Sequence, residues 1–277
     1  MLSRSVNGSS PINRWLSALA LLFACLPAWA NSPPTTLKLG VLPSENPVKM
    51  FSRLAPLREY LSLHLKQPVY LETARDYQQF IDRSNQGYYD ILLTAPHLAL
   101  MAYDSGHYDL VASFFRPLNT VFVVNKDSHL HSLEQLTGLR VAAAPEEAIV
   151  TMVGRDMLKS KIDINSIDFQ YYRNHGSAFH ALQAGEADVA IVANLIYRIN
   201  RNRFPMRVIA SSHEFPGIGV LVLRNKPEAF KSRLSDVLTH MRASTDGLVV
   251  LKKINQPGYS AATIKQFEVL RPYLKKM

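Results

Sequence analysis

Cysteine is almost absent from this sequence: its 277 residues contain a single one, Cys25. One cysteine excludes a disulfide framework and any metal site built from several cysteine ligands. Charged residues are also sparse, at 19%, and no heptad pattern or repeat of about 20–50 residues runs along the chain, which excludes coiled-coil and solenoid architectures. What is present is 47% hydrophobic residues, the composition of a globular protein with a buried core.

The first 30 residues predict a secretory signal peptide. They contain two arginines and no acidic residue, then the short apolar run 15–24, and they close on the small-x-small sequence Ala28-Trp29-Ala30. The run is shorter than the ~20 apolar residues that a membrane-spanning helix needs. We therefore expect cleavage after Ala30 and a periplasmic location.

Cleavage there would leave a mature chain without cysteine. Leu22-Phe23-Ala24-Cys25 also loosely resembles a lipoprotein cleavage box, but Phe23 fits that box poorly. Arg4 and Arg14 would both leave with the leader, so the net charge would fall from +9 to +7. Such moderate basicity in an exported protein does not indicate a nucleic-acid partner.

Beyond residue 36, short apolar runs alternate with helical patterns, which is typical of α/β proteins. The expected strands cover residues 37–42, 69–71, 90–94, 111–115, 121–124, 139–144, 169–172, 188–192, 208–210 and 220–223. Helical spacing predicts helices over residues 48–65, 76–86, 96–105, 147–159 and 177–184, with 227–276 mostly helical and broken at Pro257-Gly258. Pro56 should kink the first helix or begin a second helical segment.

The order of these segments repeats itself. A strand, helix, strand, helix, glycine and aspartate-led strand occur over residues 37–93 and again over 139–192, with Gly87-Tyr88-Tyr89-Asp90-Ile91 echoed by Gly185-Glu186-Ala187-Asp188-Val189. No Gly/Ser-rich linker separates the two halves. This plan predicts two similar α/β lobes joined by strands that cross between them.

Several short segments carry a family resemblance through their order and spacing. They are Leu39-Gly40-Val41-Leu42-Pro43, Pro56-Leu57-Arg58-Glu59-Tyr60-Leu61, Gly87-Tyr88-Tyr89-Asp90-Ile91, Thr94-Ala95-Pro96, Val123-Val124-Asn125-Lys126-Asp127-Ser128 and Ser132-Leu133-Glu134-Gln135-Leu136-Thr137-Gly138. Together these segments resemble the PhnD-like periplasmic substrate-binding proteins of phosphonate, phosphite and phosphate ABC transporters. The resemblance covers residues 37–270.

The resemblance implies an α/β, two-lobed periplasmic-binding-protein fold of type II, with a ligand cleft between the lobes. Lobe one would comprise residues 37–119 plus 214–277 and lobe two residues 120–213, with hinge strands near Thr120–Val124 and Ser211–Val220. The chain would close around a small oxyanion such as phosphonate, phosphite or phosphate and deliver it to an ABC permease in the inner membrane, without a cofactor. The alternative is a ligand-sensing subunit of the same fold that signals to a membrane kinase or cyclase.

The resemblance also implies which residues bind the ligand, since the family holds an anionic head with hydroxyls, helix N-termini and a histidine. The candidates are Ser44, Thr94, His97, Glu146, Glu147, His175, Ser177 and Asn194. His175 occupies the position of the family's histidine, although a histidine just before a helix is also typical of a surface loop. Thr94 could simply end a strand, and Ser44 could cap the next helix.

One turn departs from the family pattern. Where phosphonate-binding members have a Ser/Thr-rich turn, this chain has Ala144-Pro145-Glu146-Glu147-Ala148. Two carboxylates in the cleft would repel a phosphonate, so a ligand that carries an amine, or a quite different ligand, becomes credible.

Other motifs give little support for a metal site or an enzyme. His129-x-His131 has no third ligand at suitable spacing, so no metal site is expected there. Gly-x-Ser-x-Gly, Walker and His-Glu-x-x-His sequences are missing, so nothing in the sequence supports a hydrolase or a nucleotide-dependent enzyme.

Overall fold

The computed structural model describes residues 1–2 and 35–275, and from Thr36 onward the chain forms one compact unit. The expected signal peptide and its cleavage site therefore lie outside the described residues, except for Met1 and Leu2. None of the helices in the described part is long and apolar enough to cross a membrane.

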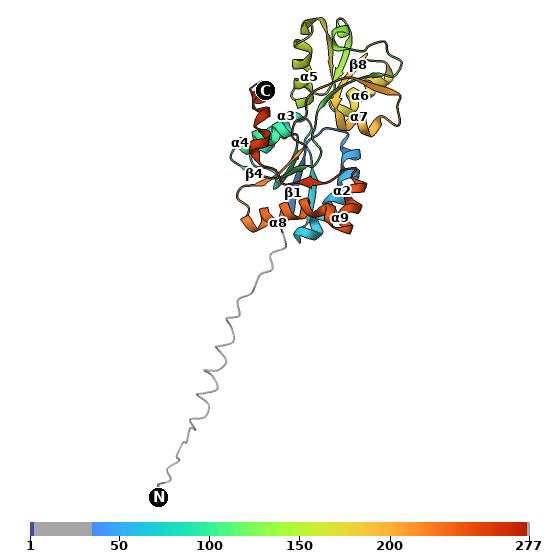
Figure 1. Ribbon diagram of the computed structural model, residues 1–277. Helices are drawn as coiled ribbons and strands as arrows, with labels where there is room; N and C mark the ends of the chain where they lie inside the picture. Colours follow the sequence, from blue (N-terminus) through green and yellow to red (C-terminus); the bar gives the residue numbers. More distant parts are fainter. Residues whose placement is uncertain (3–34, 276–277) are drawn as a thin grey trace. The chain divides into compact units, whose positions relative to one another are not determined.

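Two sheets organise the described residues. The first contains β1 (Leu37–Val41), β2 (Val69–Glu72), β3 (Ile91–Thr94), β4 (Tyr108–Phe114), β10 (Gly219–Leu223) and β11 (Tyr259–Ser260). The second contains β5 (Thr120–Asn125), β6 (Arg140–Ala143), β7 (Asp168–Tyr171), β8 (Val189–Ala193) and β9 (Met206–Ser211). In Figure 1 the first sheet and its helices are coloured blue to cyan and orange to red, because both ends of the described chain build it.

The helices lie mostly between the strands in chain order. The α-helices are α2 (Pro47–Leu65), α3 (Tyr77–Asn85), α4 (Pro96–Asp104), α5 (Ile149–Lys159), α6 (His175–Ala184), α7 (Asn194–Asn200), α8 (Glu228–Thr239), α9 (Thr245–Lys253) and α10 (Arg271–Leu274). Short 3-10 helices are η2 (Leu133–Leu136), η3 (Ile164–Ser166), η4 (His240–Ala243) and η5 (Ile264–Leu270).

The two sheets share one topology. Read from one edge, the first has the order β2-β1-β3-β10-β4-β11 and the second the order β7-β6-β8-β5-β9. The first five strands correspond one to one, and β11 is an additional edge strand of the first sheet. In the first sheet β1 pairs in parallel with β2 and β3, and β10 then runs antiparallel beside β3. In the second sheet β6 pairs in parallel with β7 and β8, and β5 runs antiparallel beside β8. The antiparallel strand of each sheet follows a strand of the other in sequence, so the chain crosses twice.

An aspartate at the start of a parallel strand plays the same part in both sheets. Asp90, before β3, accepts a hydrogen bond from the backbone N–H of Lys38 at 2.8 Å. Asp188, before β8, accepts one from the backbone N–H of Arg140 at 2.9 Å. Each carboxylate thus accepts a hydrogen bond from a backbone N–H group near the start of the neighbouring strand. The echoed sequence motifs therefore reflect a repeated structural device.

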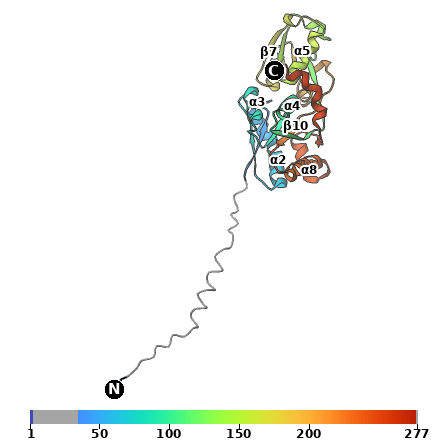
Figure 2. The same cartoon turned by 90° about the vertical axis from the view of Figure 1, so that its left-hand side faces the viewer.

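Helices cover both faces of each sheet. In the first sheet, Leu93 faces a core shared with α2, α8 and α9, whereas Leu92 faces a core shared with α3, α4 and η5. Adjacent residues separate in this way because successive strand side chains point to opposite faces. Figure 2 shows α2 beside α8, and the two helices are in contact. In the second sheet, Val123 packs against α6, and Phe122 faces a core that contains Leu136 of η2.

The two crossing segments, residues 115–119 and 212–218, pair with each other. Leu118 and Phe215 form an antiparallel bridge with N···O distances of 3.0 and 2.8 Å. The side-chain amide of Asn119 also donates to the hydroxyl of Ser211. These paired segments are the only backbone connections between the sheets over residues 36–260. The exact lobe boundaries at residues 119/120 and 213/214 stay a prediction.

Gly40 lets the ring of Tyr89 approach the backbone of β1. A Cβ atom at Gly40 would lie 2.4 Å from the Cγ atom of Tyr89, which is fully buried. We expect Gly40→Ala to lower the free energy of unfolding by about 1–3 kcal/mol, because the ring must leave its packed position. Urea denaturation measures this loss. The loss should shrink in a Tyr89→Leu background, and simple additivity of the two changes would contradict the proposed steric cause.

Candidate ligand-binding site between the two sheets

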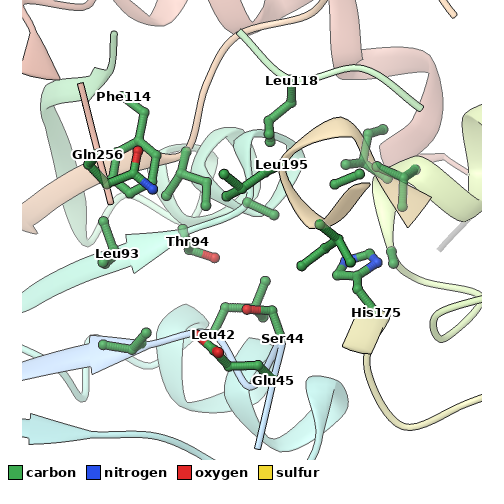
Figure 3. A pocket seen from close by; sticks show the side chains of 18 of the residues that line it. Leu42, Ser44, Glu45, Leu93, Thr94, Phe114, Leu118, His175, Leu195 and Gln256 are labelled. Atoms are coloured by element: carbon green, nitrogen blue, oxygen red, sulfur yellow. The ribbon is translucent and has the colours of Figure 1, made fainter. Parts of the chain in front are cut away.

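A cavity of about 190 Å³ lies between the two sheets. It is bordered by the carboxyl end of β3 and by segments that directly follow β1 and β8, and the starts of α4 and α5 also reach it. Ligand sites in open α/β sheets form at these strand ends, because the loops that leave neighbouring strands diverge there. Figure 3 shows side chains of the wall from close by.

Most of the cavity wall is apolar. Leu93 and Phe114 of the first sheet, and Leu42 directly after β1, line one side of the cavity. Ile149 of α5 and Leu195 of α7 line it from the side of the second sheet. A wall of this kind excludes water and strengthens the few polar contacts that a ligand can make.

The hydroxyl groups of Thr94 and Ser44 provide polar contacts in this wall. Thr94 ends β3 and is 1% exposed, and its Oγ1 atom has no hydrogen-bond partner among the described residues. Figure 3 shows this hydroxyl directed into the cavity, with Ser44 on the neighbouring loop. A buried hydroxyl without a partner costs free energy, so its position indicates a donor or acceptor kept for a ligand.

In the described part of the chain, three helices begin beside the cavity without a side-chain cap. The residues before α4, α5 and α7 are Ala95, Ala148 and Ala193, which have no polar side chain, and all three line the cavity. The first N–H groups of a helix have no partner within the helix and favour negative charge. Pro96 has no N–H group, so in α4 the donors begin at His97.

Among the described residues of the wall, a single ion pair forms, between Glu45 and Arg53. The Nε atom of Arg53 donates to Glu45 at 3.0 Å, and both side chains are half-buried. Because the two charges compensate each other, Arg53 does not add net positive charge to the cavity. Any anion inside it would depend on neutral donors.

His97 connects elements of the two sheets. Its Nε2 atom lies 2.8 Å from the backbone carbonyl of Glu147, so Nε2 carries the hydrogen and donates. The Nδ1 atom is buried and has no partner among the described residues. Protonating Nδ1 would bury a charge, and burial accordingly lowers the pKa of His97 to about 4.

His175 forms a second connection. At the start of α6, its Nε2 atom lies 3.5 Å from the hydroxyl of Tyr77 on α3, and both residues line the cavity. His175 as a whole is half-buried, but its Nδ1 atom is buried and has no partner in the described part of the chain. Burial lowers the pKa of His175 to about 4, so the ring is neutral near pH 7.

Among the expected ligand-binding residues, the structure thus brings Ser44, Thr94 and His175 to one cavity, with His97 next to it. Ser177 does not line this cavity; its hydroxyl and N–H both lie near the Oδ1 atom of Asn174, at 3.2 and 2.9 Å. Asn194 begins α7, and its Oδ1 atom is buried without a partner among the described residues. The part that each of these residues takes in ligand binding stays a prediction.

Glu146 and Glu147 do not line this cavity. The carboxylate of Glu146 is exposed and pairs with Arg155 at 3.0 Å, and Glu147 offers its backbone carbonyl to His97. The helix expected from residue 147 begins at Ile149, so both glutamates lie in the preceding turn. The charge of Glu147 nevertheless reaches Tyr77 of the cavity wall, where burial and then this carboxylate raise the pKa of the Tyr77 hydroxyl. The expected repulsion of a phosphonate by the two carboxylates stays a prediction.

Sequence reasoning missed four polar residues of the wall: Glu45, Arg53, Tyr77 and Gln256. Glu45 directly follows Ser44 and could have been found from that position. The other three lie within or after helices, where neither a strand end nor a motif marks them.

No group of three or more His, Cys, Asp or Glu side chains in residues 35–275 is placed to hold a metal ion. The polar groups that line the cavity in the described part of the chain are hydroxyls, an amide, a neutral histidine and one compensated ion pair. These groups can bind a small molecule by hydrogen bonds, and the shared topology of the two sheets places them at the cleft of a type II periplasmic-binding-protein fold.

Comparisons with known proteins agree with that class. The family described as ABC transporter, phosphonate, periplasmic substrate-binding protein matches residues 39–267. The chain belongs to this family and is a PhnD-like periplasmic binding protein.

Solved structures show the same fold. PhnD1 from Prochlorococcus marinus in complex with methylphosphonate matches with a TM-score of 0.80 and 17% identity, over 88% of this chain and 98% of that one. A binding protein component of an ABC phosphonate transporter from Pseudomonas aeruginosa matches with a TM-score of 0.77 and 19% identity, over 87% and 86%. A Xanthomonas citri protein bound to ATP matches with a TM-score of 0.69 and 18% identity, over 87% and 97%.

Proposed function

We propose that this protein binds a small oxyanion of the phosphonate, phosphite or phosphate type in the periplasm and delivers it to an ABC permease in the inner membrane. In this proposal the leader over residues 1–30 is removed on export. The observation that carries the proposal is the cavity between the sheets, where the unpartnered hydroxyl of Thr94 meets Ser44 and the uncapped starts of α4 and α5. Hydroxyls and helix N-termini are groups that bind oxyanions.

Ligand binding would be coupled to closure of the two lobes. Hydrogen bonds between elements of the two sheets include His97 to Glu147, Tyr77 to His175, and the Nη2 atom of Arg173 to the backbone carbonyl of Arg75 at 2.8 Å. We infer that these contacts form in the closed state and break in the open one, with the paired segments 115–119 and 212–218 bending. A bound ligand would favour closure because it contacts both sides at once.

We expect an oxyanion ligand both to stabilise the mature protein and to contract it. A thermal-shift screen with methylphosphonate, ethylphosphonate, phosphite, phosphate and sulfate should identify at least one ligand that raises Tm by several degrees, since a ligand at about 100 Kd adds ~2.7 kcal/mol. Small-angle scattering with that ligand should then show a smaller radius of gyration.

Two outcomes would contradict different parts of this proposal. If no oxyanion shifts Tm while an amine or a neutral solute does, the ligand class is wrong. If a saturating ligand leaves the scattering curve unchanged, the hinge is wrong although binding stands.

A further inference from the structure

A second cavity, of about 480 Å³, adjoins the first. Glu45, Ile196 and Ile199 line both, so the second cavity lies at the mouth of the proposed ligand site. Its wall comes from α2 and the β2–α3 loop on one side, and from the start of α6 and the end of α7 on the other. Both sheets therefore contribute to this mouth.

The mouth is strongly basic. Lys49, Arg75, Arg173 and Arg203 line it, and Glu45 is the only acidic residue among the described residues of its wall. Arg75 pairs with Asp76, and Glu45 pairs with Arg53. The pKa of the Asp76 carboxyl is lowered by the backbone N–H of Gln79, then by Arg75, and also by the charge of Arg173, which forms no ion pair of its own in the described part of the chain. Within the described residues, Lys49 and Arg203 have no acidic partner.

The two cavities thus differ in chemistry. The inner one offers neutral donors within an apolar wall, and its single cation is compensated. The mouth offers Lys49 and Arg203, one from each side, without an acidic partner among the described residues, and Arg173, which shares Asp76 with Arg75. A phosphonate held inside would leave Lys49 and Arg203 without an anionic partner. Converging cations in a cleft raise the local concentration of anions and bind carboxylate or phosphate groups.

We propose that the ligand carries a second anionic group, which the cations at the mouth bind while the first oxyanion is held inside. This inference rests on the proposed function and specifies its ligand class: an elongated molecule with an anion at each end and an apolar linker. The inner cavity, somewhat larger than the ~150 Å³ space that holds benzene, leaves room for a short alkyl chain beside the apolar wall.

The contact between Arg173 and the carbonyl of Arg75 supports this ligand class. It brings cations from the two sides of the mouth together, and the single charge of Asp76 offsets only part of their repulsion. A ligand anion between the two sides would offset the rest, so the second anionic group would favour closure.

The experiment compares matched pairs of ligands by calorimetry. Ethylphosphonate, propylphosphonate and butylphosphonate each lack only the carboxylate of 3-phosphonopropionate, 4-phosphonobutyrate and 5-phosphonopentanoate. We expect at least one carboxylated member to bind tenfold or more tightly than its alkyl partner. That advantage should decrease as NaCl is raised from 20 to 300 mM, because the mouth is partly exposed to solvent.

A double variant tests the cations at the mouth separately from the inner cavity. Lys49→Gln with Arg203→Gln removes two cations without touching the cross-sheet contact of Arg173. The matched control, Arg201→Gln with Lys253→Gln, removes the same charge from exposed positions that line neither cavity. The mouth variant should lose tenfold or more in affinity for the preferred carboxylated ligand and less than threefold for its alkyl partner. The control should bind both ligands as the wild type does.

Three results would overturn the inference. If alkyl and carboxylated phosphonates bind equally well, there is no second anion site, although the proposed function stands. If the mouth variant weakens both members of a pair equally, the mouth holds the phosphonate itself. If neither series binds to the wild type, the proposed oxyanion ligand fails and this inference fails with it.

Discussion

Thr94→Val is expected to preserve or raise the stability of the ligand-free protein while it weakens phosphonate binding tenfold or more. Valine has nearly the shape of threonine, so the substitution removes a hydroxyl and changes packing little. The Thr94 hydroxyl is buried and has no partner among the described residues, so its loss should add up to about 1 kcal/mol to the free energy of unfolding. A ligand that uses this hydroxyl would lose a charge-assisted hydrogen bond of about 1.5–3 kcal/mol.

Thr120→Val provides the matched control. Thr120 is fully buried like Thr94, but its hydroxyl donates to the backbone carbonyl of Val150 at 3.1 Å. Removing that donor leaves a buried carbonyl with fewer partners, so this variant should lose about 1–3 kcal/mol of stability. Urea denaturation gives the stabilities and calorimetry gives the affinities. A Thr94→Val protein that is destabilised as much as Thr120→Val, with unchanged affinity, would show that the hydroxyl serves the fold.

Much of the fold could be predicted from the sequence, because buried strands and helices place their apolar residues at a regular spacing. The continuous apolar run at residues 90–94 is β3, buried between two layers of helices, and the aspartates before β3 and β8 mark the repeated plan. Pro56 was expected to kink its helix or to begin a second helical segment. The helix α2 continues from Pro47 to Leu65, with Leu54 and Leu57 on either side buried in the core, so no second helix begins at Pro56. The kink stays a prediction.

The sequence pattern did not predict the shortest strand. The strand β11 contains only Tyr259 and Ser260, in a region predicted to be mostly helical. Its existence depends on pairing with β4, which lies far away in sequence. A strand of two residues is too short to show a periodic pattern, so the sequence does not predict its pairing with β4.

The candidate site was predictable only where residues follow strands. Thr94 and Ser44 could be placed at the cavity because the ends of neighbouring parallel strands meet at one edge. Arg53 lies well inside a helix, and Gln256 comes from a C-terminal turn, so long-range packing alone brings them there. Glu146 was also expected in the cleft because of its position after β6; its exposed carboxylate pairs with Arg155, and its part in ligand binding stays a prediction.

Acidification is expected to destabilise the protein through His97. Burial lowers the folded-state pKa of this histidine to about 4, below the ordinary value of 6.5. Between these values the unfolded chain binds more protons than the folded protein. The contribution of His97 is therefore complete above pH 6.5 and is lost as the pH falls toward 4. Between pH 7.5 and 4.5 this loss should amount to roughly 2–3 kcal/mol in the free energy of unfolding.

His97→Gln isolates this contribution from the carboxylates that also titrate in acid. Glutamine can still donate to the carbonyl of Glu147 but cannot be protonated, so the variant should lose 2–3 kcal/mol less stability over the same pH range. Exposed His131 provides the control: His131→Gln should keep the acid sensitivity of the wild type.

Protonation of His97 should also weaken the proposed closure of the two lobes. His175, the other titratable group acting on His97, also has a pKa lowered to about 4, so both rings become charged in the same acidic range and repel each other across the site. The proposed cross-sheet contacts should then weaken, and ligand affinity should fall below pH 5 less steeply in His97→Gln than in the wild type. Equal acid sensitivity of the two proteins, in both urea denaturation and calorimetry, would show that His97 is not the group that titrates.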